Sequence, residues 1–414
     1  MRSPRIKSRL LGFLLLFALV VIGGAGWYWY THVRIASLLS PFMRDLDDTP
    51  PLSSLDLPQY IVYGFVPYWN LTKTIVQPEI THLAYFSLPI SEEGHLDGIT
   101  SPVSDDPDAD ISSRRWRSAQ LDRVINELRP NQKLTITLTQ FDTEVIENFL
   151  GSTQAQNTFQ ADMKSFLETT TRPVSGVNVD IEYAGEASPE LRQQYVEFIK
   201  RTRQTLDTYA KSAGKQPLQL SMSVFASAAS RHLLWDLPAL TPYIDQTVVM
   251  AYDFHRPSSP VAGPVAPLFG AKNVWDNDVV LHLREFLDVM PAEKILLGVP
   301  FYGYEWETTE TENPRALSFP GTGGTASYGR VQQLLQDPEY FPITQGWDEE
   351  ALSPYLVYFK DGRQHVIYYE DAKSLGYKLE LVTGLRLGGI AIWALGYEDG
   401  SRELWDAIDQ YLAE

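Results

Sequence analysis

The sequence predicts an α/β fold of the (β/α)8 TIM-barrel type, and three observations lead to this prediction. Eight short runs rich in Val, Ile and Leu recur between about residue 59 and the end of the chain, as expected of strands buried on both faces. Stretches with helical periodicity lie between many of these runs, which indicates parallel strands joined by crossover helices. The interval between the seventh and eighth runs is much longer than the others, which indicates an inserted substructure.

The expected strands and helices alternate along the chain. The strands are Tyr60–Val66, His82–Leu88, Lys133–Thr139, Gly176–Glu182, Leu218–Val224, Thr247–Tyr252, Ile295–Phe301 and Gly389–Ala394. The helices are Ser113–Leu128, Gln156–Thr169, Pro189–Ala213, Asp276–Val289 and Arg402–Leu412. The first crossover, residues 70–81, is too short for a full helix, so we expect only one or two turns there.

The long interval from Tyr302 to Gly388 contains elements of its own. It includes a strand-like run at Tyr304–Thr308, a helical pattern at Tyr328–Leu335 and two strand-like runs that flank Asp361-Gly362. An Asp-Gly pair between two such runs is typical of a tight hairpin turn. We therefore predict a small α+β insertion at about residues 304–380, between barrel strands seven and eight.

The first 34 residues are expected to be a cytoplasmic basic segment followed by a transmembrane anchor. Four basic residues precede an uncharged stretch of 21 residues from Leu10 to Tyr30, which is long enough to span a bilayer as a helix. Trp27, Tyr28, Trp29 and Tyr30 end this stretch as an interfacial aromatic belt would. The positive-inside rule then places the rest of the chain outside the cytoplasm. The alternative is secretion after cleavage of a signal peptide near Gly23-Gly24-Ala25.

The remaining chain divides into a linker and a catalytic body. Residues 35–58 are acidic and rich in Pro and Ser, without sustained periodicity, which predicts a linker. Residues 59–414 hold the predicted barrel. The formal net charge is -18 although the first 34 residues carry five basic and no acidic side chains. Such an acidic body argues against nucleic acid as a partner.

Composition excludes some kinds of site. The chain has no Cys, so neither a disulfide nor a Cys-based zinc site can form. The seven His residues are scattered and lack metal-ligand spacing, so we predict no metal and no cofactor. The supply of 10 Trp and 22 Tyr residues suits a protein that stacks on sugar rings, although a large aromatic core would explain it as well.

The run at residues 175–182 is the most informative part of the sequence. Polar residues alternate strictly with β-branched apolar ones, which predicts a strand with one polar face. Asn178, Asp180 and Glu182 share that face, with successive side chains roughly 6.5 Å apart. Two carboxyl groups held this close raise each other's pKa, so one can stay protonated near neutral pH. A protonated acid beside an ionised one is the usual requirement for cleaving a glycosidic bond.

Four motifs in the right order resemble family 18 of the glycoside hydrolases, the chitinase family. They are Ser175–Glu182, Met250–Asp253, Leu297–Gly303 and Gly388–Trp393. The first is similar to the family's Asp-Gly-x-Asp-x-Asp-x-Glu motif and the second to its Met-x-Tyr-Asp motif. The resemblance covers roughly residues 60–414 and extends to a bacterial branch of spore-cortex and peptidoglycan N-acetylglucosaminidases.

The resemblance implies a role for each matching residue. Glu182 would be the proton donor to the leaving oxygen, and Asp180 would orient the substrate acetamido group. Tyr252 would bind the acetamido carbonyl, Asp253 would contact a sugar, and Trp393 would form the floor under the reacting sugar. These positions place the site at the carboxyl ends of the strands, where TIM barrels carry their active sites.

Further substrate contacts are expected from Asn178, Met250, Tyr68 and Phe86, which lie on or next to the same strand ends. Asn178 stands where the family pattern has a second Asp, and it can form hydrogen bonds but cannot ionise. We expect this change to shift the pH profile rather than to abolish activity, and relatives that act on spore cortex or peptidoglycan often have Asn here.

Other departures from the pattern leave details open. Ser175 replaces the first Asp of the motif, and strand three ends in Thr139-Gln140 instead of Gly-Gly, which puts the shape of one cleft wall in doubt. In the loop after strand six, His255 and Arg256 could touch the substrate or stabilise the loop, and the sequence does not choose between these roles.

Together these observations predict a monomeric, membrane-anchored, extracytoplasmic glycosidase. The resemblance implies retaining hydrolysis of β-1,4 bonds in N-acetylglucosamine-containing polymers, either chitin-type oligomers or peptidoglycan glycan, by substrate-assisted catalysis. The alternative from another class is an inactive lectin that binds such polymers on the same barrel.

Overall fold

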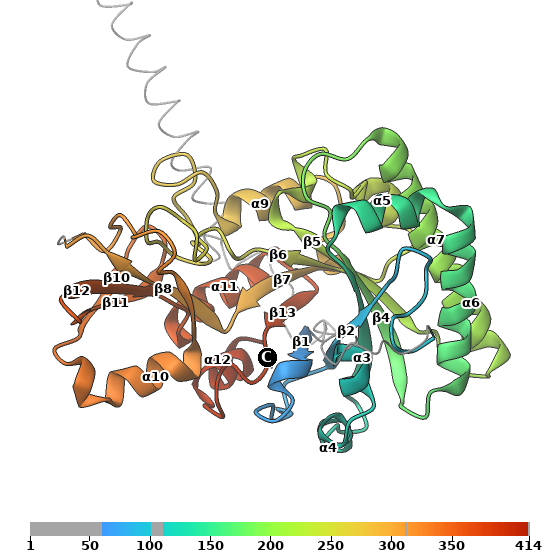
Figure 1. Cartoon of the computed structure of the whole chain (residues 1–414), viewed down its shortest axis with the longest axis horizontal. Helices are drawn as coiled ribbons and strands as arrows, with labels where there is room; N and C mark the ends of the chain where they lie inside the picture. The colour runs from blue at the N-terminus through green and yellow to red at the C-terminus, as the bar shows by residue number, and fades with distance from the viewer. Residues whose placement is uncertain (1–59, 101–110, 311–312, 413–414) are drawn as a thin grey trace, which may run out of the picture. The chain divides into compact units, whose positions relative to one another are not determined.

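Eight parallel strands close into a barrel in the computed structural model, which describes residues 60–100, 111–310 and 313–412 (Figure 1). Around the barrel the order is β1-β13-β7-β6-β5-β4-β3-β2. The strands are β1 Ile61–Pro67, β2 His82–Pro89, β3 Lys133–Gln140, β4 Val174–Ile181, β5 Gln219–Phe225, β6 Gln246–Met250, β7 Ile295–Pro300 and β13 Gly389–Trp393. The (β/α)8 barrel and all eight predicted strands are confirmed.

Helices surround this barrel and agree only in part with the prediction. They are α3 Ile111–Trp116, α4 Ala119–Asn126, α5 Thr143–Gly151, α6 Thr153–Thr169, α7 Pro189–Ser212, α8 Leu237–Leu240, α9 Val279–Leu287, α11 Ala372–Leu385 and α12 Glu403–Leu412. The single helix predicted over 113–128 is wrong, because α3 ends at Trp116 and Ser118 caps the next helix by accepting a hydrogen bond from the Leu121 amide. Capping by Ser is a common way to start a new helix.

Three helices, α5, α11 and the single turn α8, were missed in the sequence. Asp142 caps α5, and Asp371 caps α11 through a reciprocal pair of bonds with Ser374. In α11 the buried face carries Lys378, whose ammonium group pairs with the equally buried Glu370 at 2.9 Å. A charged residue on the inward face weakens the apolar periodicity by which a helix is recognised.

The first crossover is short, as expected. It contains the 3-10 helix Tyr68–Asn70 and a further turn. Three other short 3-10 helices, at Ala226–Ala229, Ala292–Lys294 and Pro338–Tyr340, also lie in connections.

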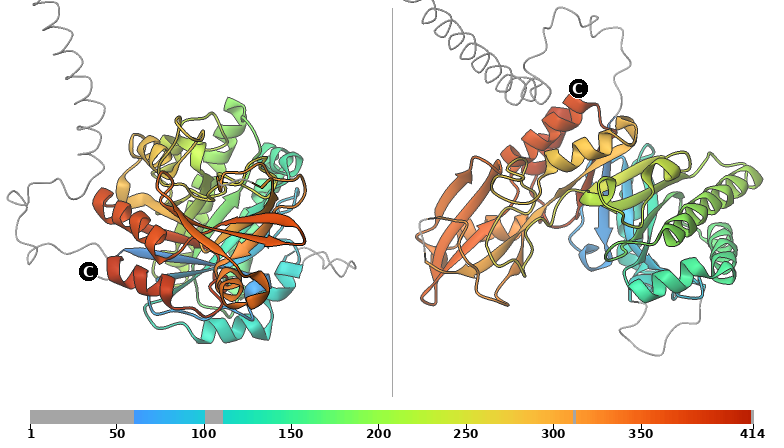
Figure 2. Two further views of the ribbon diagram at one scale, coloured as in Figure 1. Left: turned by 90° about the vertical axis from the view of Figure 1, so that its left-hand side faces the viewer. Right: turned by 90° about the horizontal axis from the view of Figure 1, so that it is seen from above.

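A second sheet of five antiparallel strands lies between β7 and β13 in the chain. Its order is β10-β11-β12-β8-β9, from β8 Tyr302–Thr308, β9 Gly324–Ser327, β10 Thr344–Asp348, β11 Ser353–Lys360 and β12 Arg363–Tyr368, with helix α10 at Tyr328–Gln336. It stands beside the barrel in Figure 1 and in the right-hand view of Figure 2, and it lies in front of the barrel in the left-hand view of Figure 2. Asp361 and Gly362 form the β11–β12 turn with φ angles of 52° and 77°, which Asp and Gly tolerate better than other residues.

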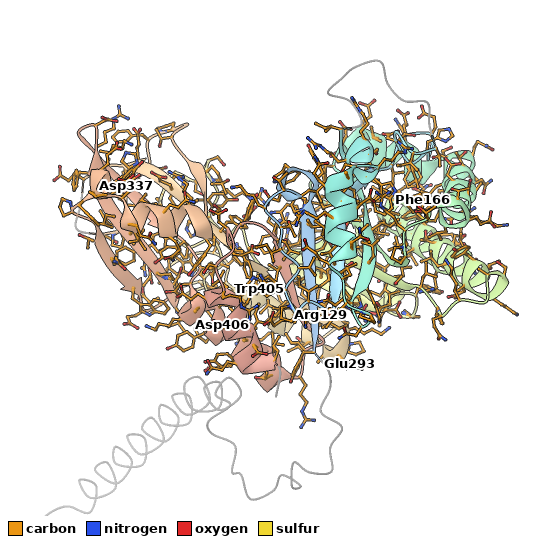
Figure 3. All side chains as sticks on the ribbon, turned by 90° about the horizontal axis from the view of Figure 1, so that it is seen from below. Arg129, Phe166, Glu293, Asp337, Trp405 and Asp406 are labelled. Carbon is orange, nitrogen blue, oxygen red and sulfur yellow. The ribbon has the colours of Figure 1, made fainter. Side chains whose placement is uncertain are left out.

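The barrel interior is filled by side chains from alternate strand positions. Tyr63, Phe65, Ala84, Phe86 and Leu296 are among the buried residues of one apolar cluster, and Trp393 packs against it from the carboxyl end. At the junction with the last helix, Trp405 of α12 is fully buried and meets Phe301 edge to face at 5.5 Å (Figure 3). The barrel interior is therefore a packed core.

Within the described ranges, no helix combines the length and apolar composition needed to cross a membrane. The predicted anchor over residues 10–30 and the predicted linker over 35–58 lie outside those ranges.

Candidate active site

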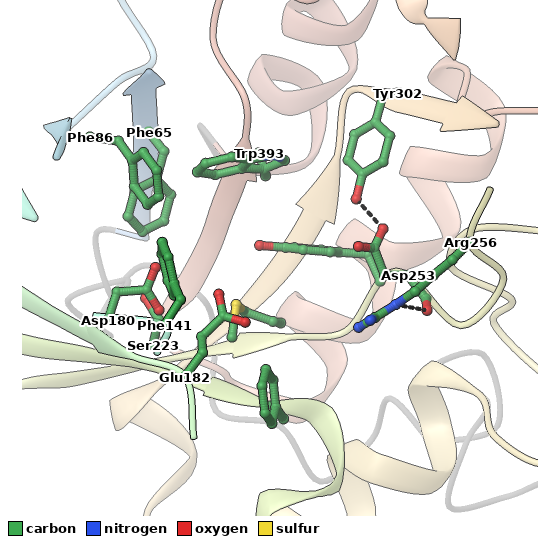
Figure 4. A pocket seen from close by; sticks show the side chains of 13 residues that line it. Phe65, Phe86, Phe141, Asp180, Glu182, Ser223, Asp253, Arg256, Tyr302 and Trp393 are labelled. Atoms are coloured by element: carbon green, nitrogen blue, oxygen red, sulfur yellow. Dashed lines mark hydrogen bonds between the residues drawn. The ribbon is translucent and has the colours of Figure 1, made fainter. Parts of the chain in front are cut away.

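A pocket of about 290 Å³ opens at the carboxyl ends of the barrel strands (Figure 4). Its walls come from the barrel strands β1, β2, β4, β5, β6 and β13 and from the segments that follow β3, β4 and β6. The first strand of the inserted sheet, β8, completes them. The lining residues are Phe65, Phe86, Phe141, Asp180, Glu182, Ser223, Phe225, Met250, Tyr252, Asp253, Arg256, Tyr302 and Trp393.

Asp180 and Glu182 reach this pocket from the end of one strand. Asp180 is the second-last residue of β4, and the Glu182 amide continues the pairing with β3 by donating to the Gln140 carbonyl at 3.0 Å. Both side chains therefore keep the inward direction set by strand alternation. The side chain of Asp180 is buried, and its Oδ1 has no hydrogen-bond partner among the described residues.

Burial raises the pKa of both carboxyl groups. For Asp180, loss of solvent raises the pKa well above its usual value, the charge of Glu182 raises it further, and the Ser223 hydroxyl opposes the shift. For Glu182, burial raises the pKa to about 7, while Arg256 lowers it and Asp253 raises it. Two adjacent buried carboxyl groups resist double ionisation, so the pair retains a proton near neutral pH.

Asn178 lies directly behind this pair and is fully buried. Its Nδ2 donates to Ser221 Oγ, and its Oδ1 accepts from Ser223 Oγ, both at 3.1 Å. Tyr63 extends the network, with its hydroxyl 3.3 Å from Ser221 Oγ. Because serine hydroxyls occupy both ends of the amide, Asn178 supports the wall of the pocket and does not line it.

Aromatic rings form the side of the pocket opposite the inserted sheet. Phe86 meets Trp393 edge to face at 4.7 Å between ring centroids and stacks on Phe141 at 6.4 Å. Gln140 fixes Phe141, because its Nε2 donates to the Ile90 carbonyl while its Oε1 accepts from the Phe141 amide. Phe141 nevertheless remains 48% exposed. The Gln140 side chain thus shapes the wall that the sequence left in doubt.

Asp253 is held in a conformation that few residues adopt. Its φ is 61°, in the left-handed region, where Asp is better tolerated than most residues. Its Oδ1 accepts hydrogen bonds from the hydroxyls of Tyr302 and Tyr304, the latter at 2.8 Å. Its carbonyl accepts from Arg256 Nε at 3.3 Å. The inserted sheet therefore fixes the loop after β6, since both tyrosines belong to β8.

The Tyr252 hydroxyl faces the pocket without a hydrogen bond to any other described residue. Burial raises the pKa of this phenol well above its usual value, and the charges of Asp180, Asp253 and Glu182 raise it further. The hydroxyl is therefore neutral and able to donate a hydrogen bond to a ligand.

Seven of the nine predicted site residues line one pocket: Asp180, Glu182, Tyr252, Asp253, Trp393, Met250 and Phe86. Two predicted substrate contacts do not. Asn178 is enclosed by the serines of β5, and Tyr68 lies in the turn after β1, where it packs edge to face on Trp69 at 4.9 Å.

Several lining residues were missed. Phe65, Ser223 and Phe225 are inward-facing residues at or near strand ends, so strand alternation could have identified them. Tyr302 stands inside the strand-seven motif and was not assigned to the site. Phe141 depends on the conformation of the β3 loop, which the sequence did not predict.

The loop residue Arg256 lines the pocket, whereas His255 turns away and its Nδ1 lies 2.8 Å from the Pro264 carbonyl oxygen.

No group of three or more His, Asp or Glu side chains that could hold a metal ion occurs among the described residues. The polar atoms of the pocket are instead carboxyl, hydroxyl and guanidinium groups.

A closed (β/α)8 barrel with two neighbouring carboxyl groups of raised pKa in an aromatic pocket is typical of the glycoside hydrolase class. The sequence profile "Glycosyl hydrolases family 18" matches residues 55–398, so the chain belongs to that family and is a glycoside hydrolase.

Relatives support this assignment. The chain is 27% identical over 305 residues to a probable endochitinase of Caenorhabditis elegans, covering 69% of this chain and 47% of the relative. It is 25% identical over 303 residues to a putative sporulation-specific glycosylase of Bacillus subtilis, covering 71% and 64%. The alignments thus span only about half to two thirds of these curated relatives.

The fold is also found in solved structures. The crystal structure of Ostrinia furnacalis group IV chitinase in complex with allosamidin superposes with a TM-score of 0.69 at 22% identity, and covers 86% of this chain and 99% of the chitinase chain.

The raised pKa of Glu182 predicts a pH-dependent effect on stability. A carboxyl group with a pKa near 4.5 when unfolded and about 7 when folded favours folding while protonated, and this contribution is lost as the pH rises through 7. Replacing Glu182 by Gln removes the cost of a buried charge, so Glu182→Gln should raise the melting temperature more at pH 8 than at pH 5. Thermal unfolding at both pH values measures this difference. The exposed Glu186→Gln is the matched control, and an equal effect of the two variants at pH 8 would contradict the prediction.

Proposed function

We propose that this chain is a retaining glycosidase that hydrolyses β-1,4 bonds in polymers containing N-acetylglucosamine, and that the substrate's own acetamido group is the nucleophile. The observation that carries the proposal is a pair of unsatisfied groups in the pocket. Among the described residues, Asp180 Oδ1 has no hydrogen-bond donor, and the neutral Tyr252 hydroxyl, which lines the pocket, has no hydrogen-bond acceptor. A secondary amide presents one N–H and one C=O, which satisfy this pair.

The arrangement of the carboxyl groups favours an internal nucleophile. A carboxylate nucleophile needs a partner about 5–5.5 Å away, with the two groups on opposite sides of the sugar. Asp180 and Glu182 instead extend from the same face of one strand, so they approach the sugar from one side. Family 18 enzymes are an exception to the two-carboxylate scheme.

In the proposed first step, protonated Glu182 donates its proton to the glycosidic oxygen while the acetamido oxygen attacks the anomeric carbon. The C–O bond to the leaving sugar breaks and an oxazolinium ion forms. Asp180 accepts a hydrogen bond from the acetamido N–H and offsets its positive charge, and Tyr252 aligns the carbonyl oxygen. Holding an internal nucleophile in line can supply several kcal/mol of the barrier.

In the second step, water attacks the anomeric carbon of the oxazolinium ion and passes a proton to Glu182. The ring opens, the acetamido group is restored, and two inversions give net retention. Trp393 would form an apolar floor for the sugar, and Phe86 supports its indole from the side. The pKa of about 7 suits Glu182 to both steps, because an acid–base group works best when its pKa is near the working pH.

We also propose that the catalytic body is anchored at the outer face of a membrane. The support is in the sequence, where basic residues precede the 21 apolar and aromatic residues from Leu10 to Tyr30.

The anchor predicts that the full-length protein stays with the membrane. After cell fractionation the protein should be found in the membrane pellet, resist extraction by high salt, dissolve in detergent and retain its N-terminal residues in intact-mass measurement. A soluble mature form that begins near Gly26 would instead establish cleavage of a signal peptide.

The assignment of the acid predicts a large loss of rate in Glu182→Gln. Turnover of an unactivated N-acetylglucosamine oligomer should fall by about 10²–10⁴-fold, the usual contribution of general acid–base catalysis, while binding of the oligomer persists. An aryl glycoside with a good leaving group should lose less, because its departure needs less protonation. Near-full turnover of the unactivated oligomer by the variant would exclude Glu182 as the acid. Absence of turnover by the wild-type protein would favour the lectin alternative.

Substrate assistance predicts that hydrolysis requires the acetyl group at the cleavage site. Fully deacetylated oligomers should bind without being cleaved, a thiazoline analogue of the oxazolinium ion should inhibit, and Asp180→Asn should lower kcat more than it raises KM. Steady-state kinetics with acetylated and deacetylated oligomers of equal length provide the comparison. Efficient cleavage next to a glucosamine that lacks the acetyl group would contradict the mechanism.

A further inference from the structure

Arg256 is the only basic residue that lines the described pocket. Its backbone amide donates to Ser259 Oγ at 2.9 Å, and its backbone carbonyl accepts from Trp306 Nε1 at 3.2 Å. These two hydrogen bonds hold the backbone of the loop in place at Arg256. The side chain bonds only through Nε, to the Asp253 carbonyl. The two terminal nitrogens of the guanidinium group form no hydrogen bond or ion pair with the described residues.

This free guanidinium contrasts with the arginines of the neighbouring insertion, which form ion pairs. Arg315 pairs with Asp348 and Glu350, Arg330 with Glu305, and Arg363 with Glu307. A guanidinium group presents two parallel N–H donors that match a carboxylate. At Arg256 those donors remain available, and the side chain extends into the pocket (Figure 4).

The position of Arg256 relative to the two carboxyl groups indicates which sugar it would contact. In Figure 4 Asp180 lies on one side of Glu182, and Arg256 lies on the other. Under the proposed function, Asp180 holds the acetamido group of the sugar being cleaved, and Glu182 protonates the oxygen that leaves. Arg256 is then on the side of the leaving sugar.

The leaving oxygen in a β-1,4 polymer is O4 of the next sugar, and O3 is attached to the adjacent carbon. A substituent on O3 of that sugar therefore starts only three bonds away from the atom that Glu182 protonates. A 3-O-lactyl ether, the group that distinguishes N-acetylmuramic acid from N-acetylglucosamine, carries a carboxylate only three bonds beyond O3. Chitin has a hydroxyl there and offers no charge to a guanidinium group.

We propose that Arg256 binds the free lactyl carboxylate of an N-acetylmuramic acid residue on the leaving-group side, and so directs this enzyme to bonds between N-acetylglucosamine and N-acetylmuramic acid. This inference rests on the proposed function. It specifies glycan without a stem peptide at that sugar, because the peptide converts the lactyl carboxylate to an amide. An amidase that removes the peptide must then act before this enzyme.

The experiment compares three oligomers of equal length: an alternating N-acetylglucosamine–N-acetylmuramic acid oligomer with free lactyl carboxylates, the same oligomer with those groups converted to methyl amides, and a chitin oligomer. Wild-type kcat/KM should be about tenfold higher for the carboxylate than for the amide oligomer, as expected for one hydrogen-bonded charge pair. Arg256→Gln should reduce this ratio to near one, whereas Arg256→Lys should retain part of it.

The ratio of kcat/KM for the carboxylate oligomer to kcat/KM for the amide oligomer reports binding of the lactyl carboxylate separately from any effect of Arg256 on Glu182. Loss of the guanidinium group raises the pKa of Glu182 for both substrates alike, so that effect cancels. The matched control is Arg129→Gln. Arg129 is an exposed residue in the loop before β3, at the amino end of the strands and away from the pocket (Figure 3). This variant should keep the wild-type ratio.

Calorimetric binding to Glu182→Gln provides a second readout that does not need turnover, and addition of Arg256→Gln should abolish the preference for the carboxylate oligomer. Equal wild-type kcat/KM for the carboxylate and amide oligomers would overturn the role of Arg256, and so would an unchanged ratio in Arg256→Gln. In either case, hydrolysis of the chitin oligomer would still support the proposed function. Failure of the wild-type protein to hydrolyse any of the three would contradict the proposed function, and equal binding of the two alternating oligomers would still refute the inference.

Discussion

The burial of the Asp180 carboxyl group next to Glu182 is the constraint on which the rest of the site depends. A buried carboxylate is costly unless it is compensated, and two of them side by side are costlier still. The barrel meets this constraint by retaining a proton on the pair, and the nearby Ser223 hydroxyl partly offsets the rise in the pKa of Asp180. The other carboxyl oxygen, Asp180 Oδ1, has no hydrogen-bond partner among the described residues.

The surroundings of the pair keep both side chains in place without adding charge. Asn178 occupies the inner position of the strand and bonds to two serines of β5, so the layer below Asp180 is polar but neutral. Asp180 therefore has Glu182 as its acidic neighbour and cannot share a proton with Asn178. Farther out, Tyr302 and Tyr304 of the inserted sheet fix Asp253 in its left-handed conformation. The insertion thus forms part of the pocket wall, and through Asp253 it also positions Arg256.

The barrel and much of the site could be predicted because their sequence patterns are local. Buried parallel strands are continuous apolar runs, and strict alternation in β4 places Asp180 and Glu182 on the inner face. The helices were predicted less well for equally local reasons: Ser118 interrupts an otherwise continuous helical pattern, and Lys378 puts a charge on the buried face of α11. That lysine is stable there only because Glu370, eight residues earlier, pairs with it.

By itself the sequence determined the class of fold, the strand that carries the two carboxyl groups, and the motifs that identify the family, because each of these depends on neighbours within a few residues. Only the tertiary structure decided which side chains share the pocket. It placed Asn178 behind the wall and Tyr68 beyond it, added Phe141 from a loop, and showed that Arg256 rather than His255 lines the pocket. The reason is physical: a hydrogen bond from Ser223 to Asn178, or from Tyr304 to Asp253, joins residues about fifty positions apart in the chain. Such contacts form only when the barrel closes, and no short stretch of sequence contains both partners.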